Sequence, residues 1–488
     1  MTLDELLRLV SSDPATAVRI DSRRVRAGDV FVAIRGPNCD GHDFIGQAVA
    51  GGAKYIVCES DRAMPDLTGP SGKPVPIRVD SPAVAAGRLA QVAKGNPGAQ
   101  LTNLAVTGTN GKTTITFLVR SCIETAGSKC GLMGTVVYDT GSGATSSSLT
   151  TPDCLTIADA QRQMVNSGAE YMVIEASSHA LSQDRLAGVN FRAAAFTNLT
   201  GDHLDYHKTT ENYLAAKTRL FTALMPEATA VLNKQVPESQ SIARATKARI
   251  CWYAVDEPAD LTARIESMTV QGTRFTIEYR GRRERVKTPL LGRYNVSNHL
   301  AAAGLCLGAG LDLSTVAAGL SSLKGVPGRL EKVASDGFAV LVDYAHTDDA
   351  LQNVLTTLKP LCKGRLITVF GCGGDRDKTK RPRMARVVER LADVIFVTSD
   401  NPRTEKPEAI IDDIMVGFED PSSERVIVEA DRRKAIELAV ESARPDDIVL
   451  LAGKGHETYQ IIGDKKFDFS DKDIARQCLA ERQCTRSQ

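Results

Sequence analysis

The chain has 488 residues, of which 42% are hydrophobic and 24% are charged, proportions typical of a soluble globular protein. This length is too great for one hydrophobic core and predicts roughly three domains of ~100–200 residues each. Sixty Lys and Arg residues against 59 Asp and Glu give a formal net charge of +1. No global field therefore favours nucleic acid or an anionic membrane surface, so we expect no nucleic-acid partner and local binding of anionic ligands. We also expect a monomer.

The opening stretch MTLDELLRLV predicts an amphipathic helix containing Asp4 and Glu5, where a secretory signal would need an uninterrupted apolar segment. No apolar run approaches the ~20 residues required to span a membrane. We therefore expect a cytoplasmic protein without membrane insertion. The eleven cysteines form no CxxC pair, which argues against a disulfide framework and a thiolate zinc site and predicts free, mostly buried thiols.

Residues 1–98 have the pattern of a small α/β domain. A strand is predicted over 29–34, a helix near 44–50, a second strand over 55–58 and a helix over 83–93. The segment KGNPG at 94–98 follows, and its glycines and proline are typical of a linker. We therefore place the first domain boundary at residue 98.

A second α/β domain, related to P-loop ATPases, is predicted over residues 99–326. A strand over 104–106 enters the polar loop TGTNGKTT, and a helix leaves it through 115–119. Further strands are predicted over 171–174, 193–196 and 229–232, whereas 260–290 alternates apolar and polar residues as antiparallel strands do. An alanine-rich helix begins near Asn298, and the turn at 325–328 closes the domain.

The last third of the chain, residues 327–488, repeats one pattern of a buried strand followed by a polar cluster. The strands at 338–342, 366–370, 394–397 and 448–451 end at Asp343, GCGGDRD, SDNPR and AGKGHE, respectively. Buried strands interleaved with helices predict a mostly parallel, doubly wound, Rossmann-like sheet. Ligands bind beyond the carboxyl ends of such strands, so all four clusters are candidate site residues.

The loop TGTNGKTT has the features of a phosphate-binding loop, although Val106 stands where the ordinary pattern has its first glycine. Its glycines allow backbone N–H groups to face phosphates, and the following helix presents its positive N-terminus. Lys112 can reach the terminal phosphates and Thr113 can bind Mg²⁺. A glycine turn with a surface lysine is the alternative. The candidate nucleotide ligands are Gly108, Thr109, Asn110, Gly111, Lys112, Thr113 and Thr114.

Two further polar groups follow neighbouring strands. Glu175 ends the strand YMVIE, where a carboxylate beside a nucleotide loop commonly holds magnesium directly or through water. The cluster Asp202–His207 follows the next strand in the same way. Each group alone could be a helix cap or a loop cluster, but together with the phosphate loop they indicate a magnesium site.

A series of motifs occurs in the order found in the Mur ligases, which the chain resembles over all three predicted domains. The motifs are TGTNGKTT, EASSHAL, TNLTGDHLDYH with a downstream ENYLAAK, YNVSNHLAA, PGRLE, DYAHT, FGCGGDRDKTKRP, SDNPR and GKGHE. No single motif carries the resemblance, which makes it specific. The shortened phosphate loop is similar to that of ATP-dependent amide ligases related to folylpolyglutamate synthase.

The resemblance implies an ATP- and Mg²⁺-dependent ligase that extends a UDP-N-acetylmuramoyl peptide during cytoplasmic peptidoglycan synthesis. ATP would phosphorylate a substrate carboxylate, an amine would attack the acyl phosphate, and phosphate would leave. Cations must bridge the carboxylate and the triphosphate, so positioning and electrostatics do most of the work. Adenine-side groups of the central domain and amino-acid-binding groups of the last domain must meet at one carboxylate, so we expect domain closure.

By the same resemblance, the catalytic candidates are Lys112, Lys217, His203 and Asp343, and the metal candidates are Thr113, Glu175, His203 and Lys217. Lys217 matches a lysine that is carbamylated in these ligases, which requires nearby cations to lower its ordinary pKa of ~10.4. A solvated helix lysine is the alternative. The remaining nucleotide candidates are Asn295 and Asn298 at adenine, Arg329 at the phosphates and Asp343 at the ribose, each of which could instead be a cap or a surface residue.

The resemblance also assigns residues to the other two substrates. The uridine diphosphate candidates are Ile20, Ser22, Pro37, Asn38 and Cys39, and the muramoyl-dipeptide candidates are Thr150, Thr151, Ser177, Gln183 and Arg185. The candidates for the incoming amino acid are Arg376, Asp400, Asn401, Pro402, Arg403, Gly453 and Glu457. For Arg185 and Arg403, a surface arginine is the alternative.

Within the family, DNPR marks the members that add meso-2,6-diaminopimelate to UDP-N-acetylmuramoyl-L-alanyl-D-glutamate. Diaminopimelate carries a carboxylate that lysine lacks, and the planar guanidinium of Arg403 suits it. A site that leaves a buried polar group unpaired can reject the wrong substrate by ~10⁴–10⁵-fold. Addition of lysine on the same scaffold is the alternative. Folylpolyglutamate synthesis is disfavoured because the first domain and SDNPR have no place in it.

A regulatory ATP-binding protein that has lost catalysis is a further alternative. Such a protein should lack a residue at the phosphate loop, Glu175, His203 or Lys217, and none is missing. One departure from the family pattern is Asp348, which follows DYAHT where proline is usual. We expect a different turn geometry there, with a consequence for the position of His346.

Overall fold

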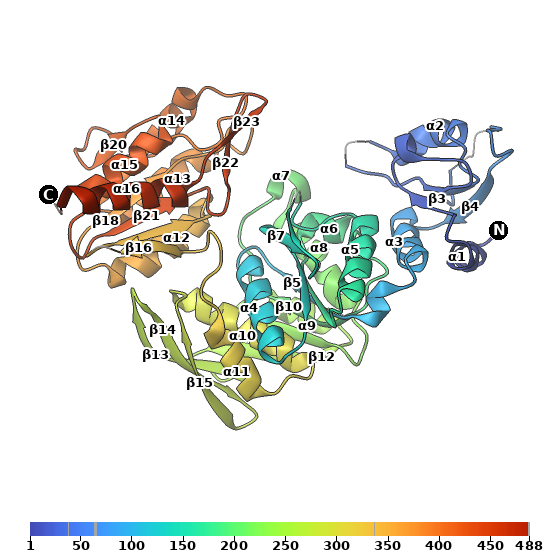
Figure 1. Cartoon of the computed structure of the whole chain (residues 1–488), viewed down its shortest axis with the longest axis horizontal. Coiled ribbons are helices and arrows are strands. Elements are labelled where there is room, and N and C mark those ends of the chain that lie inside the picture. The colour runs from blue at the N-terminus through green and yellow to red at the C-terminus, as the bar shows by residue number, and fades with distance from the viewer. Residues whose placement is uncertain (38, 63–65, 148, 336, 487–488) are drawn as a thin grey trace. The chain divides into compact units, whose positions relative to one another are not determined.

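The computed structural model, which is of the α/β class, describes residues 1–37, 39–62, 66–147, 149–335 and 337–486 (Figure 1). The chain divides into two compact units. The first unit comprises Met1–Tyr253, Ala259–Leu261 and Ala301–Gly319, and the second comprises Ala254–Pro258, Thr262–Leu300 and Leu320–Gln488. The domain boundaries at residues 98 and 326 stay predictions.

The first unit begins with a four-stranded parallel sheet in the order β1-β2-β3-β4. These strands are β1 (Val18–Arg19), β2 (Val30–Val32), β3 (Tyr55–Glu59) and β4 (Val75–Val79). The helices are α1 (Leu3–Ser12), α2 (Ile45–Ala50), α3 (Pro82–Ala93) and the 3₁₀ turns η1 (Ser22–Arg24) and η2 (Gly41–Phe44). Alternate strand residues pack on opposite sides, Val30 and Val57 with α1 and α3, and Phe31 and Ile56 with α2. The predicted elements of this segment are thus present.

A buried amide network holds the segment at 94–98 that the sequence marks as a linker. Gln91 of α3 accepts a hydrogen bond from the Gly98 N–H (3.0 Å) and donates one to Gln161 (2.6 Å). Gln161 donates to Asn103 (3.0 Å), whose own amide donates to the Gly98 carbonyl (2.7 Å). All three side chains are at most 5% exposed. The network therefore packs the end of the segment, where Pro97 and Gly98 are buried, whereas residues 94–96 are exposed to solvent.

The next strands of the first unit follow the order β12-β11-β10-β5-β9-β6-β7-β8. Their bounds are β5 (Thr102–Thr107), β6 (Cys130–Met133), β7 (Val137–Asp139), β8 (Ala144–Ser146), β9 (Tyr171–Glu175), β10 (Phe191–Phe196), β11 (Thr229–Asn233) and β12 (Arg249–Val255). All pair in parallel except β7 and β8. Because β5 lies between the parallel strands β9 and β10, the carboxyl ends of these three strands lie side by side. The phosphate loop, Glu175 and the chain after Phe196 are found at these ends.

Helices surround these strands and lead into the second unit. They are η3 (Pro97–Gln100), α4 (Lys112–Thr125), α5 (Cys154–Asn166), α6 (Ser178–Ser182), α7 (Leu204–His207), α8 (Thr210–Thr222), α9 (Ser239–Ala245), α10 (Arg293–Gly308) and α11 (Leu313–Ser322). The second unit contains β13 (Leu261–Thr269), β14 (Gly272–Tyr279) and β15 (Arg282–Thr288). β14 and β15 pair antiparallel, as the alternation in 260–290 predicts.

The rest of the second unit is the predicted doubly wound sheet, in the order β16-β17-β21-β18-β19-β20. Its strands are β16 (Glu331–Ser335), β17 (Ala339–Asp343), β18 (Leu366–Phe370), β19 (Val394–Val397), β20 (Val426–Val428) and β21 (Ile448–Ala452). All of them pair in parallel except β16, which is antiparallel to β17. A separate antiparallel hairpin is formed by β22 (Tyr459–Ile462) and β23 (Lys465–Asp468). Its helices are α12 (Asp348–Leu358), η4 (Lys359–Leu361), α13 (Lys380–Leu391), α14 (Pro407–Met415), α15 (Arg432–Ser442) and α16 (Asp471–Arg486). Leu366 and Phe370 pack with α12 to α14, whereas Ile367 and Val369 pack with α15 and α16.

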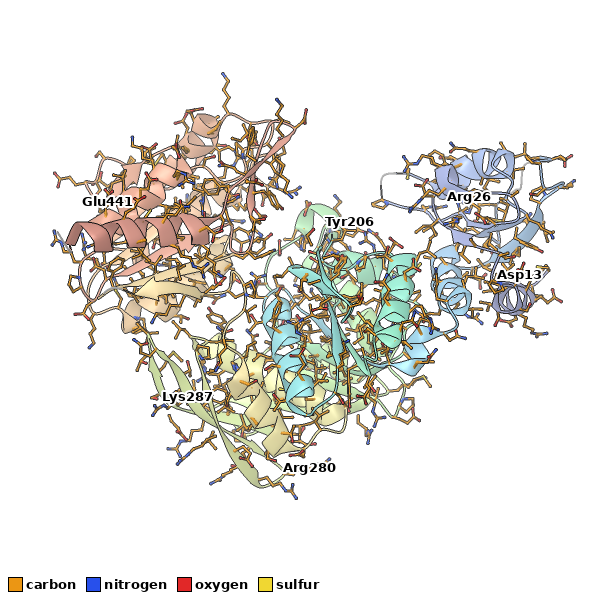
Figure 2. All side chains as sticks on the ribbon, in the orientation of Figure 1. Asp13, Arg26, Tyr206, Arg280, Lys287 and Glu441 are labelled. Carbon is orange, nitrogen blue, oxygen red and sulfur yellow. The ribbon has the colours of Figure 1, made fainter. Side chains whose placement is uncertain are left out.

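Charged side chains of both signs project from the surface, among them Asp13, Arg26, Arg280, Lys287 and Glu441 (Figure 2). Within the described residues, no helix has both the length and the apolar character needed to cross a bilayer. Ten cysteines of the described part are free, and eight of them are buried, in agreement with the prediction for the thiols.

Candidate active site

The phosphate loop forms a tight turn between β5 and α4. Gly108 and Gly111 have φ angles of +146° and +92°, in the region that favours glycine. A Cβ at Gly108 would lie 1.8 Å from Thr197 Oγ1, so a larger residue does not fit. Lys112, the first residue of α4, donates hydrogen bonds to the carbonyls of Gly108 (3.0 Å) and Thr109 (2.8 Å). The strand–loop–helix context of a phosphate site is therefore present.

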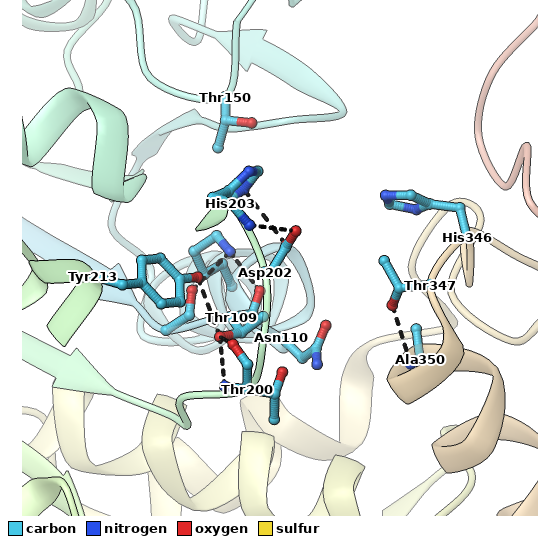
Figure 3. A network of polar contacts seen from close by, with 12 residues as sticks. Thr109, Asn110, Thr150, Thr200, Asp202, His203, Tyr213, His346, Thr347 and Ala350 are labelled. Carbon is cyan, nitrogen blue, oxygen red and sulfur yellow. Dashed lines mark hydrogen bonds and ion pairs between the residues drawn. The ribbon is translucent and has the colours of Figure 1, made fainter. Parts of the chain in front are cut away.

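Residues after β10 hold this loop in place; they belong to the TNLTGDHLDYH motif, but no site role is predicted for them from the sequence. Thr197 Oγ1 donates to the Asn110 carbonyl (2.7 Å), and the Asn198 side-chain oxygen accepts from the Asn110 N–H (2.9 Å). On the other side of the loop, Thr109 Oγ1 lies 3.2 Å from the hydroxyl of Tyr213 (Figure 3). These bonds fix the backbone of the loop that is predicted to bind phosphate.

Lys217, on α8, is buried against the phosphate loop and only 1% exposed. Its Nζ donates to the Gly108 carbonyl (2.9 Å) and lies 4.2 Å from the centroid of the Tyr213 ring. Burial lowers the pKa of Lys217 well below its ordinary value, and the charge of Lys112 lowers it further. A solvated helix lysine, the alternative from the sequence, is therefore excluded, and the amine is predisposed to be neutral.

Glu175, the last residue of β9, is 1% exposed, and both carboxylate oxygens are held by one residue. The Thr135 N–H donates to Oε1 (2.8 Å) and its hydroxyl donates to Oε2 (3.0 Å). A Cβ at Gly134 would lie 2.2 Å from Glu175 Oε1, so the carboxylate also requires glycine beside it. The Thr135 hydroxyl lies 3.1 Å from that of Thr150, a predicted substrate residue. Sequence reasoning missed Thr135.

His203 lies in a cluster of rings after β10. It adopts a left-handed φ of 55°, and its Nε2 is 3.5 Å from Asp202 Oδ2 (Figure 3). Its ring centroid lies 4.8 Å from that of His179 and 6.2 Å from that of Tyr213. Burial, together with the neighbouring His203 and His207, lowers the pKa of His179 to about 4. His179 is therefore a neutral ring against which His203 packs.

The predicted muramoyl-dipeptide residues form one hydrogen-bonded group in the first unit. The Thr151 hydroxyl donates to the Glu175 carbonyl (2.6 Å) and accepts from the Ser177 N–H (3.0 Å). Arg185 donates to the Thr151 carbonyl (2.9 Å) and to the Gln183 side-chain oxygen (2.7 Å). These contacts place Arg185 in the group, partly buried, and not on the open surface. The group continues to Tyr206, whose hydroxyl accepts from Gln183 (3.1 Å).

The uridine diphosphate candidates lie in the N-terminal segment. Ser22 is buried and its hydroxyl donates to Gln47 (2.7 Å), while Ile20 packs partly buried against the α1–α3 core. Pro37 and Cys39 lie exposed in a turn closed by a hydrogen bond from Gly36 N–H to the Cys39 carbonyl (2.8 Å). Asn38 falls outside the described residues. The nucleotide-sugar roles of these residues stay predictions.

Three nucleotide candidates of the second unit, Asn295, Asn298 and Asp343, are buried, whereas Arg329 is partly exposed. Asn298 donates to the Asn295 side-chain oxygen (3.0 Å), and both residues are at most 6% exposed. The Asp343 carboxylate accepts from the N–H groups of Leu330 (2.6 Å) and Ala345 (2.8 Å). Burial raises the pKa of Asp343, whereas the charge of Arg329 opposes the increase. Asp343 thus orders the PGRLE turn as well as ending β17.

The candidates for the incoming amino acid gather at the ends of β18, β19 and β21. Arg403 has a left-handed φ of 53° and donates to the Gly374 carbonyl (2.7 Å). Asn401 is 4% exposed and donates to Glu457 Oε2 (2.8 Å). A Cβ at Gly453 would lie 2.7 Å from Asp400 Oδ2, which explains the glycine there. The structure thus brings DNPR and GKGHE together.

The other two members of this set differ in exposure. Pro402 is buried, and its carbonyl would lie 1.9 Å from a Cβ at Gly374, so the GGDRDK and DNPR backbones are closely packed. Arg376 is exposed on the GGDRDK loop. Its role in the pocket stays a prediction.

Comparisons with known proteins agree with this arrangement. Family models described as "Mur ligase family, catalytic domain", "Mur ligase middle domain" and "Mur ligase, glutamate ligase domain" match residues 14–105, 106–306 and 328–455. A relative from Gloeobacter violaceus, named UDP-N-acetylmuramoyl-L-alanyl-D-glutamate--2,6-diaminopimelate ligase, is 43% identical over 491 residues, with 99% of each chain covered. The chain belongs to the Mur ligase family.

Two solved structures place the fold of this Mur ligase. One, titled as the structure of UDP-N-acetylmuramoyl-L-alanyl-D-glutamate--2,6-diaminopimelate ligase, is 33% identical with a TM-score of 0.67, covering 96% of this chain and 95% of that one. The other, a folylpolyglutamate synthase from Mycobacterium tuberculosis complexed with ADP and AMPPCP, is 19% identical with a TM-score of 0.62 and covers 76% of this chain and 92% of that one. The second likeness is one of fold alone.

The structure corrects one expectation for this Mur ligase, namely an altered turn at Asp348. Asp348 is the first residue of α12, and Thr347 caps the helix by accepting from the Ala350 N–H (3.2 Å). Proline is favoured at this first helical position, and Thr347, with φ −128° and ψ 159°, already has the extended backbone that a following proline requires. Aspartate therefore occupies the same turn that proline would, and His346 precedes an ordinary helix start.

No group of three or more His, Cys, Asp or Glu side chains in the described part of this Mur ligase is arranged to hold a metal ion. The donors near the phosphate loop are the hydroxyl of Thr113, the carboxylate of Glu175 and the imidazole of His203, with Lys217 beside them. Magnesium usually keeps several waters and takes further ligands from substrate phosphates, so one or two protein oxygens suffice. The residues present fit such a partial site.

Proposed function

We propose that this Mur ligase adds meso-2,6-diaminopimelate to UDP-N-acetylmuramoyl-L-alanyl-D-glutamate in an ATP-dependent reaction of peptidoglycan precursor synthesis. The new amide joins an amine of diaminopimelate to the γ-carboxylate of the D-glutamate residue. Relatives named for this reaction match the chain over nearly its whole length. The observation that carries the proposal is the cluster at the ends of β19 and β21, where Asn401 donates to the carboxylate of Glu457 and the guanidinium of Arg403 donates to the Gly374 carbonyl.

The reaction has two steps. The glutamate carboxylate attacks the γ-phosphorus of ATP, which gives an acyl phosphate and ADP. The amine then attacks the acyl carbon, and inorganic phosphate leaves. Phosphoryl transfer depends mainly on positioning and on neutralising charge. In the proposed reaction, the ATP phosphates are bound by the N–H groups of the loop, the N-terminus of α4 and Lys112.

We infer that Thr113, Glu175, His203 and a carbamylated Lys217 hold Mg²⁺. Magnesium, when bound, would neutralise charge on the phosphate oxygens. Hydroxyl, carboxylate and carbamate oxygens are donors that this ion prefers. The lowered pKa of Lys217 supports carbamylation, since only the neutral amine reacts with CO₂.

Three regions are proposed to divide the substrates. Residues 1–98 would bind uridine diphosphate, residues 99–326 would bind ATP and the muramoyl dipeptide, and residues 327–488 would bind the amino acid. The nucleotide would also contact Asn295, Asn298, Arg329 and Asp343. The acceptor contacts would come from the Thr151, Ser177, Gln183 and Arg185 group. We further propose a cytoplasmic monomer. The balanced charge supports the absence of nucleic-acid partners.

Diaminopimelate is preferred over lysine in this proposal because of the charge in the pocket. The carbonyl of Gly374 holds one nitrogen of the Arg403 guanidinium, which orients the planar group. A second carboxylate on the amino acid can accept two parallel hydrogen bonds from such a group. Bound lysine would leave the guanidinium without this partner, so the affinity for lysine should be lower than that for diaminopimelate.

The decisive experiment offers diaminopimelate and lysine in competition and measures both products. We expect the diaminopimelate product to predominate, and Arg403→Ala to reduce its formation by about 100-fold or more, since a charged bidentate contact is lost. Arg386→Ala removes an exposed arginine of α13 and is the matched control. Predominant lysine product in the wild type, or unchanged diaminopimelate incorporation in Arg403→Ala, would contradict the proposal.

A further inference from the structure

Lys454 is a fully buried lysine in the amino-acid pocket that the reaction as described does not use. It follows β21 in the GKGHE motif, and its side chain is 0% exposed. A buried ammonium is tolerated only when it is paired and hydrogen-bonded. The partners of Lys454 therefore show what its charge does.

Both hydrogen-bond partners of Lys454 belong to the proposed pocket. Its Nζ donates to Asn401 Oδ1 (3.1 Å) and to Glu457 Oε2 (3.3 Å). The rings of Tyr459 and Phe469 cover the ammonium, each with its centroid 5.8 Å away. The lysine is thus screened from water and contacts two of the residues predicted to bind the amino acid.

The lysine determines the orientation of the Asn401 amide. Asn401 Oδ1 accepts from Lys454 and also from the Ile461 N–H (2.9 Å). A flipped amide would bring its NH₂ group against these two donors, so the orientation is fixed. The Asn401 NH₂ group must then point to Glu457, and it donates to Oε2 at 2.8 Å.

The same contacts make the two oxygens of Glu457 different. Oε2 receives hydrogen bonds from both Lys454 and Asn401. Oε1 has no hydrogen-bond partner within the described part of the chain, and the Glu457 side chain keeps 15% of its surface exposed. One oxygen is therefore anchored, and the other is available to accept from an ammonium group.

We propose that Lys454 is a positioning residue for the incoming amino acid. It does not touch the substrate, but it anchors Asn401 and Glu457 so that Glu457 Oε1 accepts from an ammonium of the diamino acid while Arg403 binds its carboxylate. This inference rests on the proposed function, because it assumes that the pocket binds such a zwitterion. It predicts that loss of Lys454 impairs binding of one substrate only.

The test is Lys454→Met, which keeps the length of the side chain and removes its charge and donors. The KM for diaminopimelate should rise about 10–100-fold, the effect of losing a hydrogen bond to a charged group. The KM values for ATP and for the UDP-linked acceptor, and kcat, should change by no more than about twofold, since uniform binding of one substrate is lost. Arg365→Met is the matched control, because it breaks the ion pair with Asp447 (2.7 Å) at the amino-terminal end of the same sheet.

A double-mutant cycle separates positioning from a general loss of structure. In a Glu457→Gln background, Lys454→Met should raise the KM for diaminopimelate much less than in the wild type, because both changes act through one carboxylate. Additive effects, an unchanged KM in Lys454→Met, or an equal rise for all three substrates would overturn the proposal.

A second variant covers the case in which Lys454→Met does not fold. Asn401→Asp keeps an acceptor for Lys454 but replaces the donor to Glu457 by a like charge, so the same loss of diaminopimelate affinity is expected in protein that a thermal melt shows to be folded. A normal KM in this variant would overturn the proposal. Failure of the wild-type protein to use diaminopimelate would instead refute the proposed function.

Discussion

Tyr213 and Lys217 lie one helical turn apart on α8, and the ring centroid of the first lies 4.2 Å from Nζ of the second. Both side chains are 1% exposed. The same two residues also contact the phosphate loop, since the Tyr213 hydroxyl lies 3.2 Å from Thr109 Oγ1 and Lys217 donates to the Gly108 carbonyl. The loop and the lysine are therefore positioned by one helix face.

Lys217→Ala should lower kcat/KM by about 100–1,000-fold, the usual effect of removing one group that stabilises developing charge. If the lysine acts as a carbamate, a short carboxylate such as acetate should restore part of the activity, and depletion of CO₂ should reduce wild-type activity until bicarbonate is added. Lys247→Ala, at an exposed lysine, is the control. Equal activity with and without CO₂, together with no rescue, would contradict carbamylation.

Thr135 should prove essential for holding the Glu175 carboxylate. Thr135→Val keeps the backbone donor but removes the hydroxyl that donates to Oε2, leaving that oxygen of a buried carboxylate underpaired. We expect stability to fall by about 1–3 kcal/mol and the Mg²⁺ concentration for half-maximal activity to rise several-fold. Denaturant unfolding and a Mg²⁺ titration measure the two effects. Thr145→Val, at an exposed threonine, should change neither, and a wild-type Mg²⁺ dependence in Thr135→Val would show that Glu175 is positioned by other contacts.

His299 should make the second unit sensitive to acid. Its Nδ1 lies 2.6 Å from the Asn295 carbonyl, its Nε2 has no partner within the described residues, and Phe275 packs against the ring. Burial lowers the pKa of His299 from 6.5 to about 4, although the bond to Asn295 opposes the decrease. The unfolded chain therefore binds more protons than the folded one between these pH values, and stability falls as the pH decreases from 6.5 towards 4.

The expected loss over this range is about 3 kcal/mol, from the linkage between pKa and stability. His299→Gln, which stays neutral, should flatten this part of the profile, as read from urea unfolding midpoints at a series of pH values. His346→Gln, at an exposed histidine, should retain the wild-type slope. An unchanged slope in His299→Gln would mean that other groups cause the acid sensitivity.

The elements around the phosphate loop and the doubly wound sheet could be predicted because local chemistry determines them. Gly108 and Gly111 need backbone angles that glycine favours, and runs of buried apolar residues specify parallel strands. β4 was not predicted, since Pro76 and Arg78 interrupt its apolar pattern. It lies at an edge of its sheet, where one side of the backbone needs no partner and proline is accepted.

Parts of the site that depend on distant contacts could not be predicted. Thr135 lies 40 positions before Glu175, and neither residue carries a local signal for the pair. The burial of Lys217 could not be predicted because the sequence of its helix is polar, and Lys454 stands in a glycine-rich motif that gives no sign of burial. Each of these residues acquires its role from strands that become neighbours only in the fold.

Asp348→Pro should restore the residue usual in the family at almost no cost. Position 348 is the first of α12, where the backbone N–H needs no helical partner and the preceding Thr347 is extended. The change removes only a half-exposed ion pair with Arg383 (3.2 Å) and a favourable charge at the helix start, so stability should change by less than about 1 kcal/mol. Activity should remain at the wild-type level. Asn353→Pro, at an exposed position in the middle of α12, should cost about 3 kcal/mol or more, because it removes a helical hydrogen bond. If Asp348→Pro were as damaging as Asn353→Pro in thermal melting, the helix could not begin where the structure places it.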